Sequence, residues 1–158
     1  MSMRRSDREV KSIESVHDIL TRCDTLRLGM NGGKGYPYVI PMTFGSELKD
    51  GKIIIYLHAA GAGRKWDILT SDPRVCVEAD LYYQVKRTED GGITANYESV
   101  IGTGIAEQLT SQADKLAALK IILAHYKESG FPVSSCSGMS KVAIFRIVLD
   151  EVSGKANI

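Results

Sequence analysis

The sequence predicts a small, mainly β protein with peripheral helices, whose antiparallel strands close into a barrel. Apolar and polar residues alternate over several stretches, which is the period of a half-buried strand. Most of these stretches are joined by turns such as Asn31-Gly32-Gly33 and Asp50-Gly51, and strands joined by short turns pair antiparallel. Closing such a sheet into a barrel removes its open edges, so a barrel is the expected form.

Length and composition predict one globular domain over residues 1–158. The chain has 44% hydrophobic and 25% charged residues, which is ordinary for a folded protein. Its net charge of +1 argues against a nucleic-acid-binding surface, because such surfaces carry a broad excess of basic residues. The charged start of the chain and the lack of an apolar run of about 20 residues predict a cytoplasmic protein without a membrane span.

Two amphipathic helices are expected, over about residues 7–23 and 112–129. Ser6 and Glu9 form a capping-box pattern before the first, and Ser111 and Asp114 a similar one before the second. We expect His17 and His125 on the exposed surfaces of these helices. A short third helix is expected from about residue 64 to 69.

Five to seven strands are predicted from the alternation, and one of them contains two prolines. Pro37 and Pro41 cannot donate hydrogen bonds to a neighbouring strand, so this strand should lie at an edge or be interrupted. Its unpaired backbone groups would then be free to bind a ligand. The predicted strand segments cover about residues 25–30, 36–44, 52–59, 75–82, 93–109 and 142–152.

The turn after residues 52–59 is the best candidate for a binding site. Gly63 precedes a helix that opens with two cations, Arg64 and Lys65. A helix N-terminus already carries partial positive charge, so cations there are unfavourable unless an anion is bound. Free amides, the helix dipole and two cations together favour a phosphate. The alternative is a solvated surface on which Arg64 pairs with Asp67.

Four further residues are weaker candidates. Ser99 could donate a hydrogen bond to a phosphate. Gly102 and Gly104 allow either the close approach of a ligand or the crowding of a bent barrel, and both alternatives stay open. His58 lies just before the phosphate turn, as either a half-buried structural residue or a proton donor.

A metal site is not expected. The chain has three histidines and three cysteines, and their spacings match no zinc motif. We expect the cysteines to be reduced and mostly buried.

Several segments are similar to one protein family. The segments are 4–9, 27–29, 35–45, His58-Ala59-Ala60 with Gly63-Arg64-Lys65, 72–78, and 97–104 with Tyr97-Glu98-Ser99. The chain resembles the pyridoxamine 5′-phosphate oxidase-like split-barrel flavoproteins, and within them the NimA group, which is linked to 5-nitroimidazole resistance. The family often has a serine where this chain has Glu98, and strand alternation places Glu98 and Ser99 on opposite faces.

The resemblance implies a six-stranded antiparallel Greek-key split barrel that forms a homodimer with FMN at the interface. The phosphate would lie near Arg64, Lys65 and Ser99, and the flavin ring against the proline strand. The implied cofactor-binding residues are Val39, Ile40, Pro41, Met42, Thr43, His58, Gly63, Arg64, Lys65 and Ser99.

Two functions from different classes follow from the resemblance. The first is an FMN-dependent oxidoreductase that reduces a small electrophile, such as a nitroimidazole or another nitroaromatic, with His58 as the candidate catalytic residue. The second is a non-catalytic split-barrel protein that binds FMN, haem or a deazaflavin. Pyridoxamine phosphate oxidation is a third, weaker hypothesis, for which the chain is short. No nicotinamide-binding motif identifies the electron donor.

Overall fold

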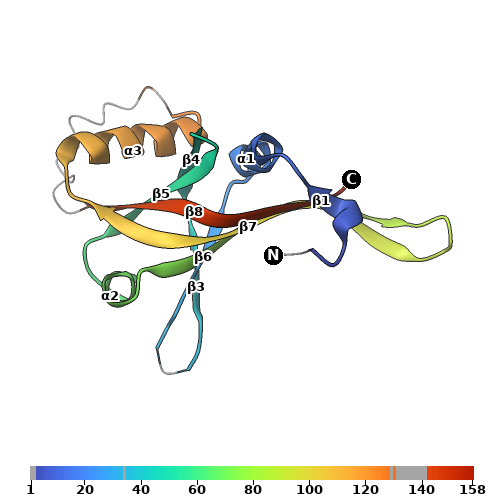
Figure 1. The fold of residues 1–158 in the computed structure, drawn as a ribbon, viewed down its shortest axis with the longest axis horizontal. Coiled ribbons are helices and arrows are strands. Elements are labelled where there is room, and N and C mark those ends of the chain that lie inside the picture. Colours follow the sequence, from blue (N-terminus) through green and yellow to red (C-terminus); the bar gives the residue numbers. More distant parts are fainter. Residues whose placement is uncertain (1–2, 34, 129, 131–141) are drawn as a thin grey trace.

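A computed structural model describes residues 3–33, 35–128, 130 and 142–158, which form one antiparallel sheet flanked by three α-helices (Figure 1). In chain order the elements are η1 (Ser6–Arg8), β1 (Glu9–Val10), α1 (Ile13–Arg22), β2 (Leu26–Met30), β3 (Tyr38–Met42), β4 (Phe44–Lys49), β5 (Lys52–Ala60), α2 (Arg64–Ser71), β6 (Arg74–Arg87), β7 (Ile93–Leu109), α3 (Gln112–His125) and β8 (Val142–Asn157).

The sheet curls into a split barrel, as the sequence predicts. Its strand order is β3-β2-β6-β7-β8-β5-β4, and β1 pairs with β8. The two end strands, β3 and β4, are consecutive in the chain and are separated only by Thr43, so the edges of the sheet must meet there. The described residues form eight strands rather than the six that the resemblance implies. The proline strand and its continuation count as two, and β1 adds a short eighth.

The proline strand is both an edge strand and an interrupted one, which confirms the prediction. In the described part of the sheet β3 pairs with β2 only, with Pro41 opposite Arg27. The strand ends at Met42, and after Thr43 the chain continues as β4, which pairs with β5 at the other end of the strand order. One edge of β3 therefore carries no neighbouring strand.

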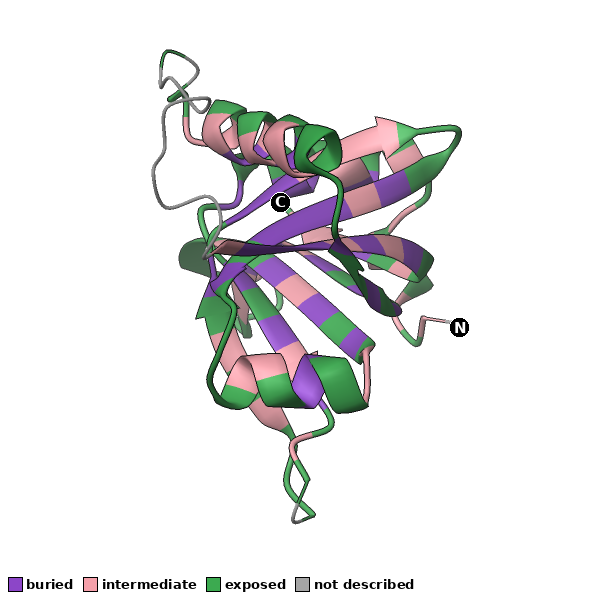
Figure 2. Cartoon of the chain, turned by 90° about the vertical axis from the view of Figure 1, so that its left-hand side faces the viewer, coloured by how far each residue is buried: buried purple, intermediate pink, exposed green. Residues whose placement is uncertain are grey.

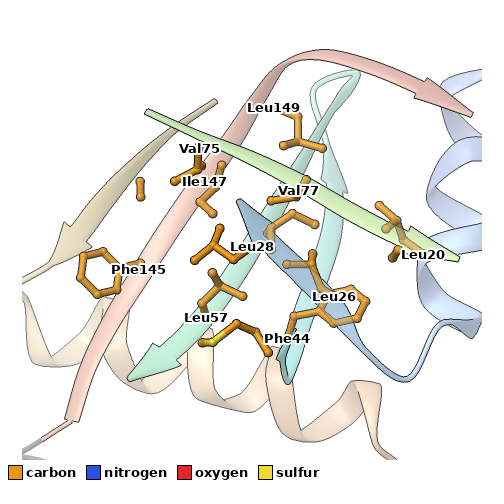
Figure 3. Packing of buried hydrophobic residues seen from close by; sticks show 14 of the residues in the cluster. Leu20, Leu26, Leu28, Phe44, Leu57, Val75, Val77, Phe145, Ile147 and Leu149 are labelled. Carbon is orange, nitrogen blue, oxygen red and sulfur yellow. The ribbon is translucent and has the colours of Figure 1, made fainter. Parts of the chain in front are cut away.

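The core fills the inside of the barrel with alternate residues from each strand. Figure 2 shows this alternation as bands of buried and exposed residues along the strands. Phe44 from β4 and Leu57 from β5 meet Leu28 from β2 in the centre, and all three are at most 1% exposed (Figure 3). The inward residues of β5 and β6 alternate along each strand and are at most 5% exposed: Ile53, Ile55 and Leu57, and Val75, Val77 and Ala79.

The first helix is shorter than predicted. Residues 6–8 form a 3₁₀ turn, and Glu9 pairs with Lys155 in the sheet, so the helix begins only at Ile13. Its N-cap is Ser12, which accepts a hydrogen bond from the Ser15 amide, so the predicted capping box at Ser6 is wrong. The sheet pairing of residues 9–10 holds the chain extended just where the helical pattern starts.

The last helix is capped as predicted but ends earlier. The Ser111 hydroxyl accepts a hydrogen bond from the Asp114 amide at 3.2 Å. The helix ends at His125 rather than near residue 129, because Lys127 adopts a left-handed conformation with φ of 61°. No helix in the described part of the chain is long and apolar enough to cross a membrane.

The histidines of these two helices are half-buried, so the prediction that they lie on the surface is wrong. His17 Nε2 lies 3.2 Å from the Ser46 hydroxyl. His125 donates to the Cys23 carbonyl at 2.8 Å, and its ring lies 4.4 Å from that of Phe44. Both helices pack against β4 on the faces that carry these rings.

The contact between α3 and β4 depends on a bare backbone at Gly45. A Cβ atom at this position would lie 2.7 Å from the backbone nitrogen and Cα of Ile122. Real Cβ contacts are not that short, so any larger residue would push the helix away from the strand.

Candidate functional site

The N-terminus of α2 has no side-chain cap. Gly63 is the N-cap residue, its φ is 101°, and no side chain accepts a hydrogen bond from the first turn. This φ lies in the left-handed region, which favours glycine. The first amides of α2 are therefore free of side-chain acceptors, as the anion-binding hypothesis requires.

Two cations stand at this N-terminus without carboxylate partners. The Arg64 guanidinium lies over the Tyr38 ring, with its central carbon 4.1 Å from the ring centroid. The Lys65 ammonium lies 3.3 Å from the sulfur of Met42. Among the described residues no carboxylate lies within ion-pair distance of either cation, so the alternative pairing of Arg64 with Asp67 is not observed. Asp67 is the acidic residue of the same turn, so the local net charge of these three side chains is positive.

His58 stands near this positive charge at the end of β5. Its side chain is on the exposed face, and its strand partner is Ile144. Burial and then the charge of Lys65 lower the pKa of His58 below its ordinary value of 6.5. Burial also lowers the pKa of Lys65. Both shifts would be opposed by a bound anion, and without one His58 is mostly neutral near pH 7.

The predicted ring-contacting residues divide between the two faces of β3. Ile40 and Met42 point toward the core side, where Lys65 lies. Val39 and Pro41 point to the opposite face, and Val39 is 58% exposed. Because β3 is an edge strand, a ligand at its free edge can contact residues of both faces.

The outer face of the barrel has a hollow of about 760 Å³ beside β3. Val39 and Gly29 form its floor together with Cys76 and Thr103, which are cross-strand neighbours in one row over β3, β2, β6 and β7. The sequence did not single out Cys76 or Thr103 for a site. The sequence pattern that could have indicated Cys76 is the alternation of this strand. Because Val75, Val77 and Ala79 point into the core, Cys76 must point to the outer face. The thiol of Cys76 is exposed, unlike the buried thiol of Cys23.

Ser99 lies away from the two cations within one chain. Ser99 of β7 is opposite Asp80 on β6 and Lys155 on β8. Tyr38, which lies under Arg64, belongs to a different row of cross-strand neighbours, and this row reaches β7 at Gly104. Tyr38 and Ser99 are therefore separated by three strand spacings and five residues along the strand, which is about 20 Å at usual strand spacings. A phosphate held by Arg64 therefore does not reach Ser99 of the same chain.

Glu98 points away from Ser99, as the alternation predicts. It is 7% exposed and accepts hydrogen bonds from Arg22 at 2.6 and 3.0 Å. The Tyr83 hydroxyl also donates to it. The carboxylate is thus turned toward α1 and does not oppose an anion on the outer face.

The two glycines of β7 are explained by crowding. A Cβ at Gly102 would lie 2.8 Å from Leu149, and one at Gly104 would lie 2.5 Å from the Val148 carbonyl oxygen. The pairing of β7 with β8 shifts register between Thr103 and Gly104. These glycines let β8 bend closely over β7, so crowding accounts for them without a ligand.

The chain belongs to the pyridoxamine 5′-phosphate oxidase family, whose model matches residues 12–156. Among curated proteins none matches this chain.

Solved structures agree with this membership. A candidate 5-nitroimidazole antibiotic resistance protein from Bacteroides thetaiotaomicron is 26% identical, with 93% of this chain and 85% of that chain covered and a TM-score of 0.80. The flavocytochrome Anf3 from Azotobacter vinelandii is 21% identical, with coverage of 99% and 72% and a TM-score of 0.79. A FAD-binding protein from Mesorhizobium loti is 21% identical, with coverage of 96% and 98% and a TM-score of 0.65. The last two likenesses show the fold alone.

Proposed function

We propose that this protein binds FMN at the α2 N-terminus and the free edge of β3, and uses it to reduce a small electrophile such as a nitroaromatic. The observation that carries the proposal is the pair of unneutralised cations, Arg64 and Lys65, on an uncapped helix N-terminus. A terminal phosphate monoester carries up to two negative charges at neutral pH, so it fits two cations and the free amides together. The Bacteroides relative supports the choice of substrate class.

Each residue of the site has a distinct role in this proposal. Arg64 and Lys65 bind the phosphate, while Gly63 leaves the helix amides accessible. The unpaired backbone edge of β3 from Val39 to Met42, together with Thr43, hydrogen-bonds the polar edge of the flavin ring. His58 donates a hydrogen bond toward the ring or the substrate. FMN, when bound, supplies the electron transfer.

The proposed site is shared between two copies of the chain. By the strand spacings within one chain, Ser99 lies about 20 Å from Tyr38, over whose ring Arg64 lies. A role for Ser99 in phosphate binding therefore requires the Ser99 of a second copy, brought to the site across the outer face of the barrel. In a homodimer with FMN at the interface, Arg64 of one copy and Ser99 of the other can lie near the same phosphate.

The phosphate contact is tested by comparing FMN with riboflavin, which lacks the phosphate. Replacing Arg64 by Ala removes a charge-assisted hydrogen bond worth about 1.5–3 kcal/mol, so FMN should bind about 10- to 100-fold more weakly. Riboflavin binding should be unchanged. The matched control is Lys120→Ala, which removes one exposed positive charge from α3. Equal losses for both ligands would mean that the substitution acts through folding, and no loss would contradict the phosphate site.

Turnover is tested separately from binding. The FMN-loaded protein should be reduced by NADH, NADPH or a chemical reductant and then reoxidised by a nitroimidazole. FMN that binds but does not pass electrons to any such acceptor would instead assign the protein to the non-catalytic flavin-binding class.

A further inference from the structure

A second pair of cations lies at the edge of the sheet, where β1 pairs with β8 (Figure 1). Glu9 of β1 is opposite Lys155 of β8, which in turn is opposite Ser99 of β7. Arg8 directly precedes Glu9 in the chain. The Lys155 nitrogen lies over the Tyr97 ring, 5.8 Å from its centroid. We call Arg8, Tyr97, Ser99 and Lys155 the edge cluster, and all of its members are half-buried.

The two hydroxyl groups of the edge cluster share one face of the sheet with its lysine. Tyr97 and Ser99 are two residues apart on β7, so their side chains point to the same side. Directly opposed residues also share a face, with Cβ atoms about 4.5–5.5 Å apart, which places Lys155 beside Ser99. Asp80, the neighbour of Ser99 on β6, already forms an ion pair with Arg27 at 2.5 Å. Its carboxylate is therefore turned to another cation.

The cations of the edge cluster are poorly neutralised. Among the described residues no carboxylate lies within ion-pair distance of Lys155. Asp7 lies 4.0 Å from Arg8, but Arg5 holds that carboxylate with two hydrogen bonds of 2.8 and 2.7 Å. Glu9 is exposed. The side chain of Arg8 is only 22% exposed, so water compensates its charge incompletely.

Both cations of the edge cluster are directed at one uncharged oxygen. Burial raises the pKa of Tyr97, but hydrogen bonds from Lys155 and Arg8 outweigh burial and bring this pKa below its ordinary value of 10. Lysine and arginine carry several N–H donors and no acceptor, so a single phenol oxygen leaves most of these donors unused. The two positive charges also repel each other. An anion between them would replace this repulsion by attraction and accept hydrogen bonds from the hydroxyls as well.

We propose that the edge cluster binds an oxyanion, namely the phosphate or carboxylate group of a small molecule. Lys155 and Arg8 supply the charge, and the hydroxyls of Tyr97 and Ser99 donate hydrogen bonds to its oxygens. Within one chain this site is separate from the α2 N-terminus, because Ser99 lies about 20 Å from Tyr38 by the strand spacings. The inference goes beyond the proposed function and does not depend on flavin binding.

The test titrates inorganic phosphate into flavin-free protein by calorimetry. Arg64→Ala and Lys65→Ala are present throughout, so that the α2 N-terminus does not contribute to binding. Adding Lys155→Met should weaken phosphate binding by about 10-fold or more, because it removes a charge-assisted hydrogen bond. The matched control is Lys52→Met, which removes an exposed lysine from β5 and should leave the affinity within about twofold. Phosphate that binds equally well to the Lys155→Met protein, or does not bind without that substitution, would overturn the inference.

A second measurement uses the protein with its natural Lys155 and covers the case in which the variant folds poorly. Phosphate bound beside Tyr97 should raise the pKa of that side chain, because a nearby negative charge disfavours the phenolate. Ultraviolet absorbance titrations with and without phosphate report the tyrosines, and the difference that disappears in Tyr97→Phe belongs to Tyr97. A Tyr97 titration that phosphate does not shift would also overturn the inference.

FMN and riboflavin distinguish two sources of the oxyanion. If Lys155→Met in the otherwise unaltered protein weakens FMN but not riboflavin, the edge cluster of a second copy binds the FMN phosphate. If it weakens inorganic phosphate but leaves FMN unchanged, the cluster serves a different acidic ligand. Either result supports the site. A protein that binds phosphate through Lys155 but binds no FMN would leave this inference standing and refute the flavin site alone.

Discussion

Replacing Glu98 by Gln should destabilise the fold by removing a buried carboxylate from its cation. The side chain of Glu98 is 9% exposed and its partner Arg22 is 39% exposed. Two hydrogen bonds join the pair, and Tyr83 donates a third to the carboxylate. Through them β7 is tied to the end of α1 and to Tyr83 of β6. Gln has nearly the same size, so the change removes charge without opening a cavity.

The size of the effect follows from the exposure of the two partners. Breaking a fully buried ion pair costs about 3–5 kcal/mol, because one charge is left without a partner or water. Arg22 keeps both water and a contact with Asp18 at 3.1 Å, so its charge is not stranded. We therefore expect the free energy of unfolding to fall by about 2–3 kcal/mol, which is near the value of a single charge-assisted hydrogen bond.

The stabilisation by the Glu98–Arg22 pair should depend on pH. Arg22 holds the pKa of Glu98 below its ordinary value of 4.5. The stabilisation is therefore fully present above that value and is lost as the pH falls through the lower pKa of the folded state. Urea unfolding should show the full difference between wild type and Glu98→Gln at pH 7 and a much smaller one near pH 3.

The result that would refute this reasoning is a loss below about 0.5 kcal/mol at pH 7, or a loss that persists unchanged in acid. A double-mutant cycle with Arg22→Met separates the pair from other effects. If the two single losses add without coupling, the ion pair does not stabilise the fold.

Three further predictions concern the core and the site. Gly45→Ala should lower the free energy of unfolding by about 1–3 kcal/mol, because its Cβ meets the backbone of α3; an unchanged melting temperature would contradict the close packing. Tyr38→Leu should weaken FMN binding by about 2- to 30-fold and leave riboflavin binding unchanged, because it removes the ring under Arg64. Tyr38→Phe retains that ring and should bind FMN as the wild type does. A Phe variant that binds FMN as weakly as the Leu variant would exclude the cation–π contact. Burial lowers the pKa of His17 from 6.5, so the unfolded chain binds the proton more readily than the folded one. The free energy of unfolding should therefore fall as the pH drops from about 7 to 5. His17→Asn should flatten this pH dependence in urea titrations, and an equal slope in the variant would refute the prediction.

Local patterns were enough to predict most of the elements. The alternation of residues 93–109 predicts β7 with its observed bounds, and the Ser111 cap predicts the start of α3. The two prolines predict that their strand lies at an edge and is interrupted. Each of these features depends on neighbours within a few residues, since side-chain period, caps and proline act locally. The first helix was mispredicted because residues 9–10 pair with residues 154–155, a contact that no local pattern encodes.

The sequence by itself also identified the parts of the candidate site. Gly63, Arg64 and Lys65 could be recognised because their order breaks the electrostatic preference of a helix N-terminus. The opposite orientations of Glu98 and Ser99 followed from strand alternation alone.

Only the tertiary structure decided how those parts are arranged. It places Arg64 over Tyr38 rather than in an ion pair with Asp67, and it separates Ser99 from Tyr38 by three strand spacings. It also brings Val39 and Thr103 into one row beneath a hollow. These relations depend on the strand order, in which β2 lies between β3 and β6. Hydrophobic alternation gives each strand an inner and an outer face, but it carries no information about which strand lies beside it.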